Sequence, residues 1–560
     1  MSESPRPQAP ARDGAVSPGS AVSAGSAVSV VVIAYNDAAH VADAIRSALA
    51  QGEAVGEVLV VDDASGDATP EVLASFAGEP RVRPLVRTEN SGGCGTPRND
   101  GIAAAVHPYV LFLDSDDLLL PGAVDGLLAV AAEERADVVA GICVRRELPE
   151  GRETVWAPSL YDVSQGATLP GTVIEGVEKH PEFVLDTLSV NKLYRRGFLD
   201  RHAIRFPDGA FHYEDFVFSA RVQAAAPRIA VTDVPVYVWH VRRQAATLSI
   251  SLRRASLANW EHRIAAHAAV VDVFRTAGRP ALAAAAQTKF LDYDLPMYLR
   301  ELPQRTAAYR ADWWTVTRAH LAGFEAAAVS AARAPSRWLH AALTALTAVP
   351  EGRELTRFVE LAAPLPRLVP PYRRAEDGAP VLAAAPADVP LEGLAELAAA
   401  ELPVAVDGSV AVGASTRLTV TVHDLYGRVA ALGPTGVRVV FTERVSAAEL
   451  PVDAPLLPAD EGWTATVTLP TSKLLRAGRL AAWSVHAELR YADGSTGNAE
   501  VRAPQGYVGR RGVVLGRLGR VLLVQVVASA RRGLVLRFAG GAVGARQVMS
   551  GRFKRLFAMR

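Results

Sequence analysis

The feature that most constrains this chain is a regular alternation of short apolar runs with helical patterns between residues 28 and 113. Four runs have the length of buried strands and are rich in β-branched and aliphatic residues: Val28–Ala34, Val58–Val61, Val82–Val86 and Tyr109–Leu113. Helical patterns lie between them, near residues 38–50, 69–76 and 96–105. This rhythm is typical of a parallel sheet covered by helices on both faces. It predicts an α/β fold for the first part of the chain.

Polar residues follow three of these runs, at the points where the predicted strands end. Tyr35 and Asn36 follow the first run, Asp62 and Asp63 follow the second, and the run 114–117 reads Asp-Ser-Asp-Asp. In open α/β sheets, ligands bind beyond the carboxyl ends of the strands. The coincidence of polar clusters with strand ends therefore predicts a ligand site at that edge.

The most acidic of the three clusters contains Asp114, Ser115 and Asp116. Carboxylates that project from a strand end can hold a hard divalent cation, Mn²⁺ or Mg²⁺, through oxygen ligands. Such a cation would screen a diphosphate as negative charge develops on it. A polar loop or a helix cap is the plainer interpretation, because Asp is also favoured just before helices. The residues alone leave both interpretations open.

The composition and the apolar pattern of the chain change after residue 251. Residues 252–349 are rich in Ala, Leu and Arg and predict a helical domain, and the proline-rich stretch 350–394 predicts a linker. Residues 395–505 alternate apolar and polar positions and include the hairpin signal Asp493-Gly494. This last pattern predicts a β-sandwich of the immunoglobulin-like kind.

The two ends of the chain differ from the rest in composition. Residues 1–26 are rich in Ala, Ser, Pro and Gly without a basic start and an apolar run, and they predict a disordered leader. Residues 506–560 hold twelve Lys and Arg and no acidic residue, although the whole chain is neutral. We interpret them as a basic tail that contacts anionic lipid or a polyanionic acceptor. No recognised nucleic-acid motif accompanies this charge, so we expect no nucleic-acid partner.

The cellular location follows from two further counts. The chain has only two cysteines, Cys94 and Cys143, which is too few for a disulfide framework and fits a reducing compartment. No run of about 18 uncharged apolar residues occurs, so we expect no membrane span. These features predict a cytoplasmic protein, peripheral to the inner face of the cell membrane through its basic tail.

Four segments appear in the order and spacing of a known family. They read VSVVVIAYNDAAHVADAIRSALAQ from residue 28, EVLVVDDASGDAT from residue 57, ENSGGCGTPRNDGIAAA from residue 89 and YVLFLDSDD from residue 109. Together they resemble glycosyltransferase family 2, whose catalytic domain has the GT-A fold. The resemblance covers residues from about 28 to 250, and it sets our domain boundary at residues 27–251. It implies a metal-dependent, inverting transfer of a sugar from a UDP-sugar to an acceptor hydroxyl.

The resemblance also implies which residues bind the donor. The candidate nucleotide-sugar ligands are Tyr35, Asn36, Asp62, Asp63, Asn90, Arg98, Asp114 and Ser115. Arg98 would give the diphosphate bidentate hydrogen bonds, although a salt bridge on a solvated helix is the plainer role. Gly92, Gly93 and Gly95 would let the backbone approach the donor. The implied metal ligands are Asp116 and His240, and a packing role remains the alternative for this histidine.

The acceptor side is implied by a second pair of segments, NKLYRRGFLDRHAIRFPDG and FHYEDFVFSARV. They resemble family members in which a Glu-Asp pair opens a helix. This match implies that Asp215 is the general base and Glu214 its neighbour. Repulsion between adjacent carboxylates can raise one pKa toward the useful range. Alternatively, the pair only stabilises the start of the helix through its dipole.

The order of domains resembles the bacterial wall teichoic acid glycosyltransferases in architecture. That likeness implies an acceptor hydroxyl on a cell-envelope glycan or a polyol-phosphate polymer, and a homo-oligomer. Two other classes stay open. A sugar nucleotidyltransferase can share the core, but its Gly-rich N-terminal loop is replaced here by Ala34-Tyr35-Asn36-Asp37. A non-catalytic glycan-binding protein would have an inactive transferase core.

Overall fold

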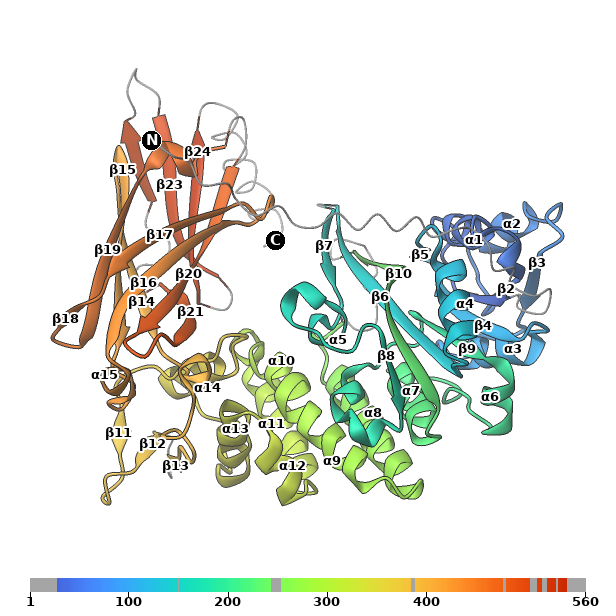
Figure 1. Ribbon diagram of the computed structural model, residues 1–560, viewed down its shortest axis with the longest axis horizontal. Coiled ribbons are helices and arrows are strands. Elements are labelled where there is room, and N and C mark those ends of the chain that lie inside the picture. Colours follow the sequence, from blue (N-terminus) through green and yellow to red (C-terminus); the bar gives the residue numbers. More distant parts are fainter. Residues whose placement is uncertain are drawn as a thin grey trace, which may run out of the picture.

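The computed structural model describes residues 28–149, 151–242, 253–383, 388–476, 480–503, 511–515, 521–529 and 532–540. The predicted leader, residues 1–26, lies outside the described residues, as does most of the predicted tail, residues 506–560. Three regions follow one another along the chain: an α/β region, a helical region and a mostly-sheet C-terminal region (Figure 1). The helices lie between the two sheet-containing regions and join them.

A mixed sheet forms the centre of the α/β region. Its first half consists of four strands that pair in parallel in the order β3-β2-β1-β4. These strands are β1 (Val28–Ala34), β2 (Val55–Asp62), β3 (Val82–Val86) and β4 (Tyr109–Asp114), and the connecting helices are α1 (Val41–Leu49), α2 (Thr69–Ala74) and α3 (Gly95–Ala104). Every residue of β1 is buried, as expected for a strand covered on both faces. The predicted α/β fold is confirmed.

The second half of the sheet brings later parts of the chain to the same place. Strand β9 (Lys192–Arg195) lies antiparallel between β4 and β6 (Val138–Leu148), and the long strand β10 (Arg228–Arg242) runs parallel to β6. Strands β5 (Leu118–Leu119), β7 (Arg152–Val155) and β8 (Thr172–Glu175) flank this half. The helices here are α4 (Ala123–Glu133), α5 (Pro158–Tyr161), α6 (Arg196–Arg201) and α7 (Glu214–Ala224).

The register of the parallel strands places their carboxyl ends at one edge. Ala34 pairs with Asp62 across β1 and β2, and Ile33 pairs with Asp114 across β1 and β4. The polar residues that follow each strand therefore start from neighbouring positions. This is the edge at which the sequence predicts a ligand site.

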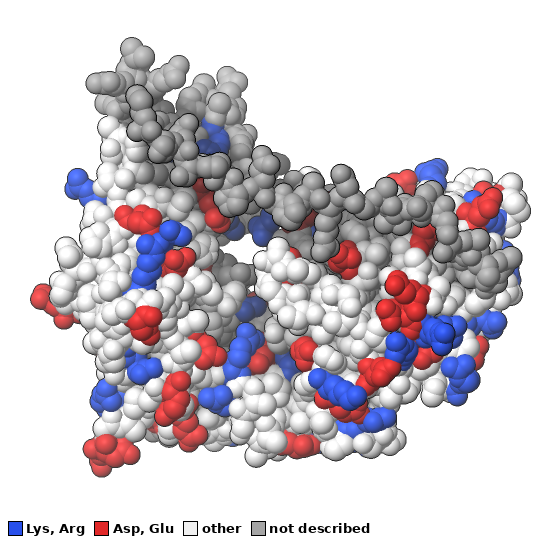
Figure 2. Space-filling model, viewed as in Figure 1, with Lys and Arg blue, Asp and Glu red and all other residues white. Residues whose placement is uncertain are grey.

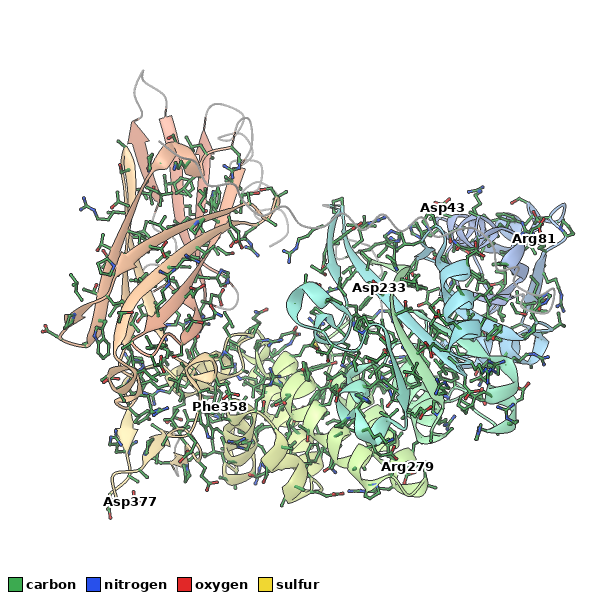
Figure 3. The ribbon with its side chains drawn as sticks, viewed as in Figure 1. Asp43, Arg81, Asp233, Arg279, Phe358 and Asp377 are labelled. Atoms are coloured by element: carbon green, nitrogen blue, oxygen red, sulfur yellow. The ribbon has the colours of Figure 1, made fainter. Side chains whose placement is uncertain are left out.

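The helical region is held together by tryptophans. It contains α8 (Leu257–Thr276), α9 (Pro280–Lys289), α10 (Leu295–Leu299), α11 (Ala307–Leu321), α12 (Ala326–Ala331) and α13 (Ala334–Ala345). Trp260, Trp313, Trp314 and Trp338 are all buried, and the rings of the first two stack with centroids 5.5 Å apart. Arg279, at the start of α9 (Figure 3), forms an ion pair of 2.7 Å with Glu178 of the α/β region.

The stretch that we predicted as a linker is largely structured. It contains α14 (Gly352–Leu361) and the short strands β11 (Arg373–Arg374), β12 (Pro380–Leu382) and β13 (Val389–Pro390). Phe358 of α14 is buried between the helices and the C-terminal region (Figure 3). Arg367 is fully buried and pairs with Glu360 at 2.6 Å and with Glu500 at 3.1 Å. This pairing ties the stretch to the C-terminal sheet.

The C-terminal region is mostly antiparallel sheet. Its strands are β14 (Val406–Val412), β15 (Ser415–His423), β16 (Pro434–Glu443), β17 (Glu449–Pro455), β18 (Leu457–Ala459), β19 (Gly462–Pro470), β20 (Leu480–Tyr491), β21 (Thr496–Arg502), β22 (Arg511–Leu515), β23 (Val521–Ala528) and β24 (Leu534–Gly540), and one short helix, α15 (Arg428–Leu432), interrupts them. Buried residues alternate with half-buried ones along β20, the pattern of a strand with one face on a core. Because β24 pairs with β20, the sheet continues beyond residue 505.

Among the described residues, no helix is both long enough and apolar enough to cross a membrane.

Candidate active site

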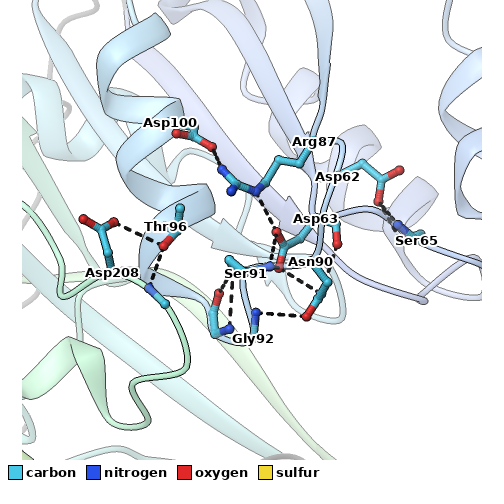
Figure 4. A network of polar contacts seen from close by, with 12 residues as sticks. Asp62, Asp63, Ser65, Arg87, Asn90, Ser91, Gly92, Thr96, Asp100 and Asp208 are labelled. Atoms are coloured by element: carbon cyan, nitrogen blue, oxygen red, sulfur yellow. Dashed lines mark hydrogen bonds and ion pairs between the residues drawn. The ribbon is translucent and has the colours of Figure 1, made fainter.

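The predicted donor side of the site is built around Asp63, which lies just beyond β2 (Figure 4). Its carboxylate accepts hydrogen bonds from Asn90 Nδ2 at 3.0 Å, from the Ser91 backbone at 3.1 Å and from Ser91 Oγ at 2.8 Å. Arg87 Nε forms an ion pair with it at 2.8 Å. Asn90 and Asp63, two predicted donor residues, therefore hold each other and fix the loop at the end of β3.

Asp62 and Asn36 fix the neighbouring loops. Asp62 Oδ1 accepts from Ser65 Oγ at 2.5 Å, whereas its Oδ2 is buried without a partner in the described part of the chain. Asn36 has a left-handed backbone (φ 49°), and its side-chain oxygen accepts from the Gly66 N–H at 2.7 Å. Tyr35, at the same edge, is 52% exposed. Tyr35 therefore offers an accessible aromatic ring at this edge.

The acidic run after β4 lies beside a second acid that we did not single out. Ser115 Oγ donates to Asp37 Oδ2 at 2.7 Å, and Asp37 Oδ1 lies 2.5 Å from Nδ1 of His40. Asp116 pairs with Arg242 at 2.7 Å. Burial, with the nearby charge of Asp114, raises the pKa of Asp116 to about 6. The edge therefore holds more negative charge than its own cations neutralise.

His240 reaches the same run from the end of β10. Its backbone N–H donates to Asp117 Oδ1 at 2.7 Å, and its Nδ1 lies 2.9 Å from the carbonyl oxygen of Asp116. A carbonyl can only accept, so Nδ1 carries the hydrogen and Nε2 keeps its lone pair. Burial lowers the pKa of His240, which favours the neutral ring. The neutral imidazole is the form that binds metals.

The residues present fit the cation that the family resemblance implies. In the described ranges, no three or more His, Cys, Asp or Glu side chains form a ready metal cage. Mg²⁺ is usually held by one or two carboxylates together with substrate phosphates, so a preformed cage is not needed. Asp116 and His240 supply a carboxylate and an imidazole at one place. The excess negative charge around Asp116 favours a cation there.

Arg98 joins the predicted donor edge to the predicted acceptor side. It lies on α3, and its side chain is only 3% exposed. One terminal nitrogen lies 2.5 Å from Glu214 Oε1 and 2.9 Å from Asp215 Oδ1, and the other lies 2.7 Å from Asp114 Oδ1. Both terminal nitrogens face carboxylates in a buried setting, so Arg98 is not on a solvated helix face and holds these acids in position. Its contact with the diphosphate stays a prediction.

The predicted Glu-Asp pair begins α7. Tyr213, directly before it, has a left-handed backbone (φ 64°), a conformation that is found at functional sites more often than elsewhere. Ser189 Oγ donates to Asp215 Oδ1 at 2.8 Å. Burial raises the pKa of both carboxyl groups, while Arg98 opposes the rise for each. A raised pKa is what a general base needs to accept a proton near neutral pH.

The glycine-rich loop packs closely against a later segment of the chain. A Cβ at Gly93 would collide with the carbonyl oxygen of Gly209, and one at Gly95 would collide with that of Pro207. These glycines therefore let residues 92–95 pack against residues 206–211, which lead to α7. Burial raises the pKa of the Cys94 thiol, so it stays protonated.

Three site residues escaped the sequence analysis. Asp37 stands next to Asn36 and could have been chosen as a further strand-end acid. Arg242 stands two residues after His240 and carried a signal in the Arg242-Arg243 pair. Ser189 carried no signal, because nothing in the sequence near it shows that it lies 2.8 Å from Asp215.

A parallel half-sheet in the order β3-β2-β1-β4 with these polar residues at its carboxyl edge is typical of α/β domains that bind a ligand beyond the strand ends. Residues 29–179 match the family model described as Glycosyl transferase family 2. The predicted family is thus confirmed for this part of the chain.

Two relatives and one solved structure extend the comparison. The chain is 33% identical to the succinoglycan biosynthesis protein ExoO of Rhizobium meliloti over 222 residues, 38% of this chain and 61% of that protein. It is 27% identical to the poly(ribitol-phosphate) beta-N-acetylglucosaminyltransferase TarS of Staphylococcus aureus over 223 residues, 40% of this chain and 36% of that protein. These matches span less than two thirds of either relative.

The crystal structure of S. aureus TarS matches the fold over more of the chain. The superposition covers 92% of this chain and 86% of that one, with a TM-score of 0.51 and 15% sequence identity. At this identity the match concerns the fold alone.

Proposed function

We propose that this chain is an inverting glycosyltransferase that moves a sugar from a UDP-sugar to a hydroxyl of a cell-envelope polymer. The observation that carries the proposal is the position of Arg98. Its one guanidinium contacts Asp114 at the donor edge and Asp215 at the start of α7. Donor-side and acceptor-side carboxylates therefore belong to one site, which is what a single-displacement transfer requires.

The donor would lie along the carboxyl edge of the parallel strands. Tyr35 offers an exposed ring for the uracil, and Asp62, Asp63 and Asn90 hold the loops on which the base and ribose rest. Asp116 and His240 would hold Mn²⁺ or Mg²⁺, with Asp114 and Ser115 beside them. When bound, the cation neutralises charge that develops on the leaving diphosphate.

The transfer itself needs one proton acceptor. As the acceptor oxygen attacks the anomeric carbon, Asp215 takes the proton from its hydroxyl. The bond between that carbon and the diphosphate oxygen breaks, and the electron pair leaves with UDP. Attack from the face opposite the leaving group inverts the anomeric centre, and no covalent sugar–enzyme intermediate forms. Arg98 and Ser189 hold Asp215 in position for this step.

The acceptor is proposed by analogy with the relatives. TarS is named for transfer of N-acetylglucosamine to poly(ribitol-phosphate), and ExoO is named for succinoglycan biosynthesis. We therefore propose a polyol-phosphate polymer or an envelope glycan as acceptor. The C-terminal sheet region would be an immunoglobulin-like sandwich. Attachment to the inner face of the membrane through the basic tail and assembly into a homo-oligomer belong to the same proposal.

Release of UDP from a panel of UDP-sugars tests the function. The full chain should release UDP from at least one donor with Mn²⁺ or Mg²⁺, and EDTA should abolish the release. Asp116→Asn should weaken donor binding and turnover together. Released pyrophosphate instead of UDP would identify a sugar nucleotidyltransferase. Glycan binding without any turnover would identify a non-catalytic binding protein.

A further inference from the structure

The C-terminal region contains a wide cavity, open to solvent, that no part of the transfer reaction uses. Its volume is about 870 Å³. Three segments line it: residues 370–372 before β11, residues 423–424 at the end of β15, and residues 458–463 in the β18–β19 hairpin. Strands β11 and β18 lie at the opposite end of the molecule from β2 and β4 (Figure 1). The cavity is therefore separate from the transfer site.

Flat rings form the apolar wall of this cavity. Trp463 is half-buried against the core of the sheet, and Tyr372 also lines the cavity. The Tyr372 ring is fixed, because it lies 4.9 Å from the ring of Tyr426 and its hydroxyl donates to the Leu368 carbonyl at 3.1 Å. Pro458 stands opposite Trp463 in the hairpin. Rigid aromatic and proline faces suit the flat C–H faces of a sugar ring.

The polar wall of the cavity is acidic. It consists of Asp424, Asp460 and Glu461, and no Lys or Arg lines the cavity within the described residues. Asp460 and Glu461 are exposed and form no hydrogen bond or ion pair in the part of the chain that the structure describes. Acidic atoms mark the edge of the molecule at the level of β18 (Figure 2). His423 is engaged elsewhere, since its Nε2 lies 2.8 Å from Asp407 Oδ2.

This combination of walls defines the chemistry of a ligand. Carboxylates accept hydrogen bonds from hydroxyl groups, and charge-assisted bonds of this kind are stronger than neutral ones. The same carboxylates repel phosphate, because no cation in the lining offsets them. We propose that this cavity binds an uncharged saccharide, as a second glycan site separate from the transfer site. The inference goes beyond the proposed transfer activity and does not depend on it.

Equilibrium binding tests the site without needing turnover. The full chain carrying Asp215→Asn, with saturating UDP, is titrated with uncharged tetrasaccharides (β-linked N-acetylglucosamine, β-linked glucose and α-linked glucose) and with unglycosylated poly(ribitol phosphate). Calorimetry should show binding of at least one uncharged tetrasaccharide. Asp460→Asn with Glu461→Gln should weaken it about tenfold. Glu449→Gln, an exposed acid of the same region outside the cavity, should leave it unchanged.

Trp463→Ala should also weaken binding by about tenfold or more, since stacking would be lost. The paired Asp460 and Glu461 variant covers the case in which this tryptophan variant fails to fold, because those two side chains are exposed. Tetrasaccharide binding that survives both variants would place the site elsewhere and overturn the inference. So would a chain that binds no uncharged tetrasaccharide, or one in which poly(ribitol phosphate) binding depends on these residues.

Discussion

Charged side chains are buried and paired at one end of the molecule and exposed at the other. At the acidic edge of the α/β region, Arg98 is buried and faces the carboxylates of Asp114, Glu214 and Asp215. At the cavity of the C-terminal region, Asp460 and Glu461 are exposed and unpaired within the described residues. Burial raises the pKa of the Glu214 and Asp215 carboxyl groups, which suits them to proton transfer. From this comparison we associate sugar transfer with the acidic edge of the α/β region and saccharide binding with the C-terminal cavity.

The largest effect should come from the proposed base. Asp215→Asn removes the proton acceptor but keeps the size of the side chain, so transfer should fall by about a thousandfold while UDP binding stays the same. Steady-state UDP release and calorimetry with UDP measure the two quantities. Asp233→Asn, an exposed acid at the bend of β10 (Figure 3), should leave both unchanged. Full transfer activity in Asp215→Asn would show that Asp215 is not the general base.

Replacing Arg98 should cause the largest loss of stability. Arg98→Ala leaves three carboxylates uncompensated in a buried setting, so unfolding of the α/β region should become easier by about 3–5 kcal/mol. Arg46→Ala breaks an exposed pair with Asp43 and should cost less than about 1 kcal/mol. Denaturant unfolding measures the free energy of unfolding of the α/β region in both variants. Equal losses of unfolding free energy in Arg98→Ala and Arg46→Ala would show that burial does not make the Arg98 ion pairs more important for stability.

Tyr35 should have a smaller effect, confined to donor binding. Its ring is exposed and supports no core, so Tyr35→Ala should weaken UDP binding by about tenfold without changing the melting temperature. Tyr35→Phe keeps the stacking face and should bind UDP like the parent chain. Calorimetry with UDP checks both. Unchanged affinity in Tyr35→Ala would place the base away from this ring.

The smallest effect is expected at the far end of the molecule. Asp460→Asn with Glu461→Gln should change the rate of UDP release in water, without added polymer, by less than about twofold, because both residues lie outside the transfer site. UDP release under the same conditions as for Asp215→Asn measures this. A loss similar to that of Asp215→Asn would show that the two ends act as one site.

The local architecture could be predicted from the sequence because it depends on short patterns. The bounds predicted for β1 and β3 agree with the structure, and β4 extends one residue further, to Asp114. In the C-terminal region, the alternation predicted over residues 395–505 is observed in strands such as β19, residues 462–470, because alternation marks a strand with one buried face. The hairpin signal at Asp493-Gly494 lies between β20 and β21.

The partners within the site could not be predicted in the same way. Arg98 contacts Glu214 and Asp215, which lie more than 100 residues further along the chain. Nothing near Arg98 in the sequence distinguishes a buried arginine from one on a solvated helix. The packing of residues 92–95 against 206–211 decides this, and it depends on close backbone contacts at Gly93 and Gly95. Such contacts have no local pattern.

A crystal structure of the full chain with UDP and Mn²⁺ tests the central claim most directly. We predict the uracil beside Tyr35, the diphosphate at the edge that carries Asp114 and Asp116, and Asp215 facing the same space. UDP bound away from this edge, or an Asp215 side chain closed off from the nucleotide, would contradict the account.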